Sequence, residues 1–169
     1  MSTENSSLNR AEGKKNLVKI TKIIIVVGII LTSFFIIYEI LNIEPDFVTL
    51  GVLNSEKKAE NYPIDVNVGE EFTVFVSVGN NLATNFTFSV HVLTGDQKTF
   101  VSKTTGSNGT LKQKLSSITI QPGEEWISNA QRFSFYSAGE NLMVIFELWK
   151  VENSKETFYD VVFLRLNVS

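Results

Sequence analysis

The sequence contains no cysteine and a single histidine. Without cysteine the chain can form neither a disulfide framework nor a thiolate metal site. His91 alone cannot build a zinc centre, and its surroundings offer no spacing typical of a Ser–His–Asp triad. A domain without disulfides must be held by its hydrophobic core, and 43% apolar residues with thirteen phenylalanines are enough to form one.

Positive charge is scarce outside the N-terminal end. Residues 39–169 carry ten Lys or Arg against sixteen Asp or Glu, a net charge of −6, whereas residues 1–22 have a net charge of +3. Binding to nucleic acid needs a basic face, because the ligand is a chain of phosphates. The composition of residues 39–169 therefore argues against a nucleic-acid partner.

One long apolar segment lies near the N-terminus. Residues 23–38 contain no charged side chain, and an extension to residues 20–43 admits only Lys22 and Glu39. About twenty helical residues cross a hydrocarbon core of roughly 30 Å. A buried helix of a soluble protein would carry a polar stripe, which is missing here. We therefore predict a transmembrane helix over residues 20–43, in contact with membrane lipid.

The flanking residues predict that this anchor is retained and predict its orientation. A signal peptide needs small residues at its cleavage site, and the apolar run is followed by YEILNIEPDF instead. Five basic residues lie between positions 10 and 22, and the next is Lys57. By the positive-inside rule residues 1–19 form a cytoplasmic basic tail, predicted to be disordered, and residues 47–169 form an exterior domain in the cell envelope.

Apolar residues alternate with polar ones throughout the C-terminal part. A period of two is typical of half-buried strands, and Gly- and Asn-rich turns separate the runs. Seven or eight short strands over this length predict an all-β fold, an immunoglobulin-like antiparallel β-sandwich preceded by one transmembrane helix. The main alternating runs lie within residues 72–78, 86–92, 133–135, 142–148 and 162–168.

A short motif occurs twice in this part. Residues 68–72 read VGEEF and residues 122–126 read PGEEW. In each, a glycine turn leads into a strand whose first large residue is aromatic, so we interpret both as turn-to-strand entries. The adjacent acids point to opposite faces of a strand and do not form a catalytic pair.

The sequence contains no pattern that indicates an enzyme. His91 alternates with Val90 and Val92, which places it on the surface-facing side of a strand. No loop has the spacing of a calcium site, and no glycine-rich segment joins a strand to a helix as in phosphate-binding loops. We therefore predict no catalytic residues, no metal and no cofactor.

Three glycosylation sequons occur in the exterior part, at Asn85, Asn108 and Asn167. About two such matches are expected by chance from the content of Asn, Ser and Thr, so the signal is weak. Asn108 is the best candidate acceptor, because it lies in a Gly/Ser loop from which a glycan can project.

The strongest functional signal is surplus apolar surface on the two C-terminal strands. If their regular positions face the core, a second apolar set faces away from it, and a three-residue turn at 153–155 brings the two halves of that set together. One interpretation is a strand pair covered by a loop of the same domain. The other, which we prefer here, is a docking face for a protein partner. The set consists of Met143, Ile145, Trp149, Tyr159, Val161 and Phe163.

Several segments together resemble the exterior domain of an archaeal membrane-protein family, the domain of unknown function (DUF) family numbered 1616. They are FVTLGVL at 47–53, AENYP at 59–63, VGE at 68–70, FELWK at 146–150 and VFLRL at 162–166. The resemblance covers most of residues 47–169 and implies an archaeal source and an exterior sandwich, without an activity. Members carry several N-terminal transmembrane helices where this sequence has one apolar segment, so functions of those helices are not implied.

These observations predict a non-enzymatic, single-pass membrane protein. Its exterior sandwich would act as an accessory or interaction module that contacts another protein of the envelope or of a membrane complex. The alternative is an attachment protein that binds the surface layer or its glycans.

Overall fold

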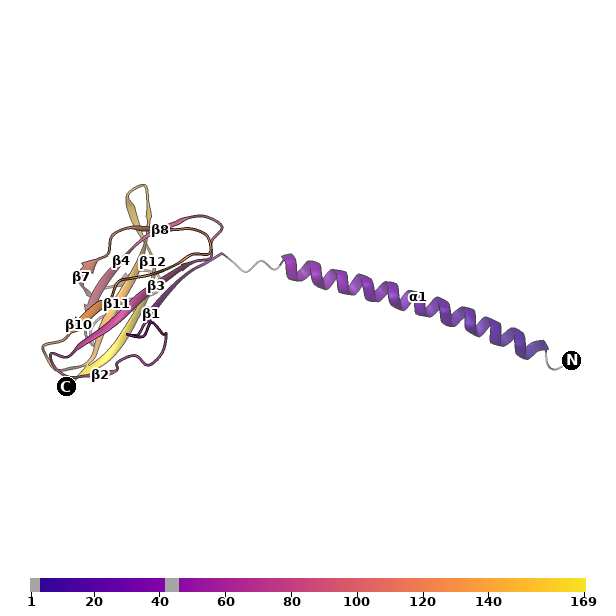
Figure 1. The fold of residues 1–169 in the computed structure, drawn as a ribbon, viewed down its shortest axis with the longest axis horizontal. Coiled ribbons are helices and arrows are strands. Elements are labelled where there is room, and N and C mark those ends of the chain that lie inside the picture. The colour runs from indigo at the N-terminus through magenta and orange to yellow at the C-terminus, as the bar shows by residue number, and fades with distance from the viewer. Residues whose placement is uncertain (1–3, 42–45) are drawn as a thin grey trace. The chain divides into compact units, whose positions relative to one another are not determined.

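The computed structural model describes residues 4–41 and 46–169, with side chains from residues 17–38 and 46–169. The chain divides into two compact units, residues 1–45 and residues 46–169. Among the described residues the first unit contains helix α1 and the second contains strands β1 to β12. Figure 1 shows the helix and the strand-rich unit.

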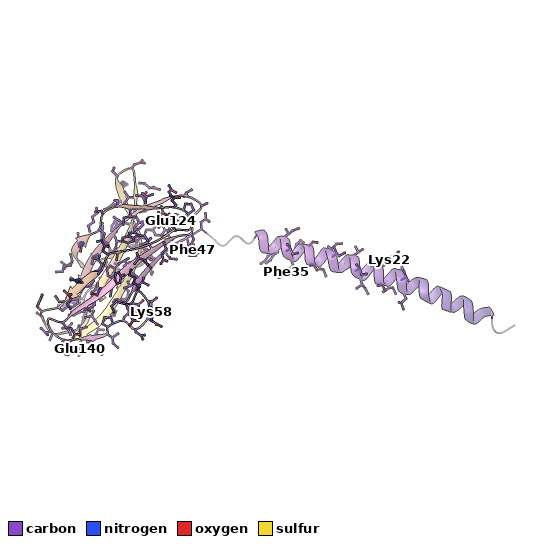
Figure 2. The ribbon with its side chains drawn as sticks, viewed as in Figure 1. Lys22, Phe35, Phe47, Lys58, Glu124 and Glu140 are labelled. Atoms are coloured by element: carbon purple, nitrogen blue, oxygen red, sulfur yellow. The ribbon has the colours of Figure 1, made fainter. Side chains whose placement is uncertain are left out.

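Helix α1 runs from Glu4 to Leu41. Its segment Leu17–Tyr38 comprises 22 residues with a mean hydropathy of 2.6, and none of it is buried in the protein. Those residues span about 33 Å at 1.5 Å per residue, enough to cross a hydrocarbon core. Thr21 and Thr32 donate their hydroxyls to the carbonyls of Leu17 and Gly28, so these polar side chains are satisfied within the helix. Lys22 and Phe35 project from its surface (Figure 2).

The helix begins earlier than the sequence predicted. Residues 4–19 were expected to be a disordered tail, but they continue α1 without a break. Helix formation is costly only at nucleation, and the apolar segment supplies that nucleus, so the preceding proline-free residues extend it. Residues 1–3 and 42–45, which include the end of the predicted transmembrane segment, lie outside the described residues.

The smaller sheet is antiparallel and is centred on β3 (Glu71–Asn80). One edge of β3 pairs with β1 (Val48–Leu53). The other edge pairs with two short strands in succession, β9 (Glu125–Ile127) and β10 (Gln131–Ser134). This edge strand is therefore interrupted at residues 128–130.

The larger sheet has six strands and is antiparallel except for its parallel pair β2–β12. Two short strands, β7 and β8, share the free edge of β4, and a separate hairpin, β5–β6, lies outside both sheets. In order across the sheet its strands are β2 (Asp65–Val66), β12 (Lys155–Val168), β11 (Gly139–Glu152), β4 (Phe86–Gly95), then β7 (Thr110–Lys114) and β8 (Ile118–Ile120). The hairpin consists of β5 (Val101–Ser102) and β6 (Gly106–Ser107).

The main core lies between the two sheets. The inward positions of β3, β4, β11 and β12 are buried, among them Val76, Phe88 and Phe146. Trp126 is half-buried at the rim of this core, edge-on to Phe88 with ring centroids 5.5 Å apart. The predicted fold class, an immunoglobulin-like antiparallel sandwich preceded by one apolar helix, is confirmed. The number of strands exceeds the seven or eight predicted, because strands of two or three residues have no readable period.

Strands β11 and β12 form a long hairpin with a tight turn. Glu152 pairs directly with Lys155, so the turn contains two residues and not the three that the sequence predicted. Asn153 and Ser154 have φ angles of 49° and 64°. Positive φ at both central residues defines a type I′ turn, whose twist matches that of the strands it joins. The gold tip of this hairpin projects beyond the neighbouring strands in Figure 1.

A β-bulge interrupts this hairpin and changes which side chains share a face. The register shifts between Leu148 and Trp149, so that Trp149 pairs with Phe158 and Tyr159 has no partner across the ladder. Phe158 therefore joins Trp149 on the outer face. Tyr159, predicted to point outward with the docking set, lies against Phe86 of the core instead, with ring centroids 5.2 Å apart.

The repeated sequence motif forms two equivalent turns, over Asn67–Glu70 and Gln121–Glu124. In each, the last residue donates its N–H to the carbonyl of the first, at 3.0 and 3.1 Å. The glutamate carboxylate in turn accepts the N–H of the first residue, at 2.9 and 2.7 Å. Gly69 and Gly123 occupy the positive-φ position that a type II turn requires. The bonds from the Asn67 backbone and side chain hold the pKa of Glu70 below its ordinary value.

Ser154 adopts a left-handed conformation in this turn, which disfavours a residue with a Cβ atom. We expect Ser154→Gly to raise the free energy of unfolding by about 1 kcal/mol. Ser154→Ala retains the Cβ atom and should give no gain. Urea denaturation of the two variants beside the parent measures both effects, and equal stabilities of the Gly and Ala variants would refute the turn assignment.

Candidate functional site

The outer face of the larger sheet is its face directed away from the other sheet, and it forms a second buried core. Met143 and Ile145 of β11 are fully buried there. They pack with Leu93 of β4 and Val161 of β12, which are 6% and 2% exposed. Three of the six residues predicted to form a docking face are therefore inaccessible.

The connection between β4 and β7, which includes the β5–β6 hairpin, provides the cover over this core. Val101 packs against it, and a Cβ atom on Gly109 would lie 3.2 Å from Ile145 Cδ1. The Lys103 ammonium donates to Asp160 of β12 at 2.8 Å. The prediction of a docking face at Met143, Ile145 and Val161 is wrong, and the alternative, a strand pair covered by a loop of the same domain, is correct. The apolar side chains that the sandwich interior does not use fill this second core.

Glu147 attaches this cover to the sheet. Its side chain is buried on the outer face of β11, where Oε1 accepts the Ser107 N–H at 2.6 Å and the Ser107 hydroxyl at 2.8 Å. Its Oε2 accepts the Trp149 indole N–H at 3.1 Å. A Cβ atom on Gly106 would lie 2.8 Å from Oε1, so glycine permits this close approach. The sequence analysis did not single out Glu147. Its position alternates in phase with Met143, Ile145 and Trp149, so an acid among apolar residues on one strand face was a signal that could have identified it.

Trp149 joins the buried core to a polar cluster beside it. Its ring stacks on His91 with centroids 4.9 Å apart, and it meets Phe158 edge-on at 5.7 Å. The indole is half-buried rather than freely exposed. Trp149 therefore stabilises the outer face of this domain, with only part of its ring accessible to a partner.

His91 lies on the outer face, as its alternation predicted, but its imidazole is mostly covered. Its Nε2 is buried without a hydrogen-bond partner among the described residues, 3.4 Å from Glu156 Oε2. Burial is the main cause that lowers the pKa of His91, and the Glu156 carboxylate opposes it. Glu156 accepts hydrogen bonds from Lys114 and Ser89, at 2.7 and 2.6 Å, and these bonds lower its own pKa.

This cluster has the organisation of a structural polar network. Each carboxylate oxygen of Glu147 and Glu156 already accepts a hydrogen bond from the protein. In the part of the chain that the structure describes, no three His, Cys, Asp or Glu residues gather where they could hold a metal ion.

The exposed remainder of the predicted docking set lies on β12. Phe163 is 38% exposed, and the Arg165 guanidinium lies 5.3 Å from its ring centre. Tyr159 is 37% exposed at the bulge. Both residues belong to the strand at the margin of the larger sheet.

The outer edge of β12 is open along most of its length. β2 pairs with β12 only at Asn167 and Val168, where Asn167 donates its N–H to Ile64. Successive backbone N–H groups along a strand point to its two edges in turn. The N–H groups of Phe163 and Arg165 therefore lie on the same edge as that of Asn167. Among residues 46–169 no strand pairs with that edge at residues 156–166.

The three sequon asparagines are all exposed, but they differ in their contacts. Asn108 accepts the Phe100 N–H through its side chain at 2.7 Å. The Asn167 side chain contacts Asp65 and Asn141. Asn85 makes no side-chain hydrogen bond to another described residue and lies just before β4. The Asn108 bond uses the side-chain oxygen and not Nδ2, the atom to which a glycan is attached, so these contacts do not separate Asn85 from Asn108, which the sequence favoured.

The domain has structural likenesses among known proteins, all at low identity. It is similar to the CARDB domain of the PF1109 protein of Pyrococcus furiosus, solved in complex with di-metal ions, with a TM-score of 0.48 and 17% identity over 75% of this chain and 90% of that one. It is also similar to the C-terminal domain of wzt, with a TM-score of 0.47 and 8% identity over 75% and 80% of the two chains. The sporulation control protein Spo0M of Bacillus subtilis has a TM-score of 0.46 and 15% identity over 72% and 49%. No family model matches the sequence, and no curated protein matches it.

Removal of the Glu147 carboxylate should loosen the cover over the second core. Glu147→Ala leaves partly buried donors of Ser107 and Trp149 without acceptors, and a buried donor without an acceptor costs about 1–3 kcal/mol. We expect the free energy of unfolding to fall by about 3 kcal/mol, and hydrogen exchange to accelerate at residues 101–107. Glu140→Ala is the matched control, because Glu140 (labelled in Figure 2) is exposed on the same strand. Unchanged exchange in the Glu147 variant would contradict the role of this carboxylate.

Proposed function

We propose that this chain is a membrane-anchored, non-enzymatic interaction module whose exterior sandwich binds another envelope or membrane-complex protein along the edge of β12. The observation that carries the proposal is the open edge at residues 156–166, which offers backbone groups to a partner strand. Strand addition at an exposed sheet edge is a common mode of peptide recognition, in which main-chain hydrogen bonds provide affinity and flanking side chains provide specificity.

The composition of this edge supports binding more than protection. Monomeric proteins guard long edge strands with lysine, proline or inward-pointing charges. Residues 157–164 read TFYDVVFL, without a lysine or a proline. One position of the edge is protected, because the Asp160 carboxylate accepts the backbone N–H of Val161 at 2.8 Å. Beyond it Phe163 and Arg165 are exposed beside the edge, and such side chains are enriched in protein interfaces.

The anchor and its orientation belong to the same proposal. Helix α1 has the length and hydropathy of a membrane span, and retention of it as an anchor agrees with the absence of small residues after the apolar run. The proposed orientation, with the N-terminus in the cytoplasm and residues 46–169 outside, is supported by the basic residues before the apolar run. Membership of the archaeal DUF family numbered 1616, suggested by the sequence motifs, would give the same arrangement.

Orientation can be tested directly because the chain contains no cysteine. Ser137, exposed between β10 and β11, and Ser7, before the apolar run, provide two positions for a unique thiol. In intact cells a membrane-impermeant maleimide should label Ser137→Cys and leave Ser7→Cys unlabelled until the membrane is permeabilised. The opposite pattern would refute the orientation, and a shortened chain that lacks residue 7 would refute the retained anchor.

Docking can be tested by removing one backbone donor from the edge. Phe163→Pro deletes an outward N–H that the β11–β12 ladder does not use, and proline is tolerated at such edge positions. We expect copurification of a stoichiometric protein partner from detergent-solubilised membranes to fall at least tenfold, while the melting temperature changes little. Phe163→Ala keeps the N–H and separates the contribution of the side chain. Full retention of the partner by the proline variant would overturn strand addition at β12.

A further inference from the structure

A groove of about 690 Å³ lies on the side of the sandwich opposite to β12. It forms where the edge strands of both sheets are interrupted. Residues 115–117 separate β7 from β8 along β4, and residues 128–130 separate β9 from β10 along β3. Side chains of both interruptions line the groove. Its volume is within the roughly 300–1,000 Å³ typical of small-molecule sites.

The lining combines an aromatic ring with neutral hydrogen-bonding groups. Trp126, Ile118 and Leu115 supply apolar surface. Around them lie three side-chain amides and two hydroxyls, and none of the lining residues is acidic, although residues 39–169 carry a net charge of −6. The polar members are Gln113, Ser116, Ser128, Asn129 and Gln131.

The two cations of the lining are both paired with acids outside it. Lys114 donates to Glu156 at 2.7 Å on the outer face of the larger sheet. The Arg132 Nε lies 3.8 Å from Glu71 on the neighbouring strand. Each cation of the lining therefore has an acidic neighbour, which weakens its attraction for a phosphate, a uronate or an acidic peptide.

Two backbone N–H groups in the interruptions that form the groove are already hydrogen-bonded within the protein. Leu115 donates its N–H to Val90, and Ser128 donates its N–H to Val76. The Ser128 hydroxyl accepts the Val76 N–H at 2.9 Å. The edge strands here, β7 and β8, are only five and three residues long, so a peptide strand could pair over a short length only, and side chains are the main recognition groups.

Two side chains of the groove are pre-organised by the protein. Gln131 is 8% exposed, and its amide donates to the carbonyl of Asn129 at 2.9 Å. Trp126 is held by its edge-on contact with Phe88, 5.5 Å between ring centroids. Among the described residues no acceptor binds the Trp126 indole N–H, and this atom is not among the buried unsatisfied ones, so it is accessible to solvent.

We propose that this groove binds a neutral saccharide chain. Neighbouring sugar hydroxyls both donate and accept hydrogen bonds, which matches side-chain amides that do the same, and the apolar face of a sugar ring packs on an indole ring. For an anionic ligand both cations of the lining already have acidic neighbours, and for a peptide only the short edges of β7 and β8 are open. This glycan site is separate from the strand-addition edge and does not depend on it.

The test uses the full chain in detergent micelles and a panel of malto-, cello- and manno-oligosaccharides of two to six sugars. Oligomers of uronic acid and an unstructured peptide serve as charged and peptide probes. We expect at least one neutral oligosaccharide to bind, measured by titration calorimetry. The double variant Gln113→Ala/Asn129→Ala, both of whose positions are exposed, should weaken that binding at least tenfold without changing the melting temperature.

Gln97→Ala provides the matched control, because Gln97 is an exposed amide outside the groove. It should bind as the parent does, and Phe163→Pro should also bind normally, which separates this proposal from docking at β12. Trp126→Phe should weaken binding as well, and if it fails to fold the double variant still decides. Absence of neutral-sugar binding, preference for the uronate or peptide probes, or an unaffected double variant would each overturn the proposal.

Discussion

Strand β11 is hydrogen-bonded along both edges, to β4 and to β12, and it is buried on both faces. Its inward side chains fill the space between the sheets, and its outward side chains lie beneath the β5–β6 hairpin. A strand in this position cannot slip by one residue, because a slip would exchange the two sets of side chains. The placement of the cover, the open edge of β12 and the groove beyond β4 all follow from this central strand.

Glu147 gives the second core a specific arrangement that apolar contacts alone would not provide. Hydrophobic contacts are non-directional, whereas a buried carboxylate that accepts three hydrogen bonds fixes the positions of its donors. The hairpin is therefore held at one place on the sheet. The same network orients Trp149, on which His91 stacks.

The two margins of the larger sheet present different chemistry. The β12 margin leaves backbone donors and acceptors open beside Phe163 and Arg165, which suits an extended polypeptide. At the β7/β8 margin the open edges are short, and the exposed neutral groups of the groove include two amides, a hydroxyl and one indole. A tethered domain with these two surfaces could contact a protein through one side and a glycan through the other.

The sequence by itself determined the apolar helix, the β-sandwich class, the repeated turns at Gly69 and Gly123 and the outward phase of His91. Each of these depends on local composition or on a period of two, which neighbouring residues express directly. Only the tertiary structure decided that Met143, Ile145 and Val161 are covered, that Tyr159 turns toward Phe86, and that residues 115–117 and 128–130 meet at a groove. The cover and the groove arise from contacts between segments distant in sequence. The bulge shifts the alternation by one residue without changing the residues that produce it, so the period alone cannot reveal it.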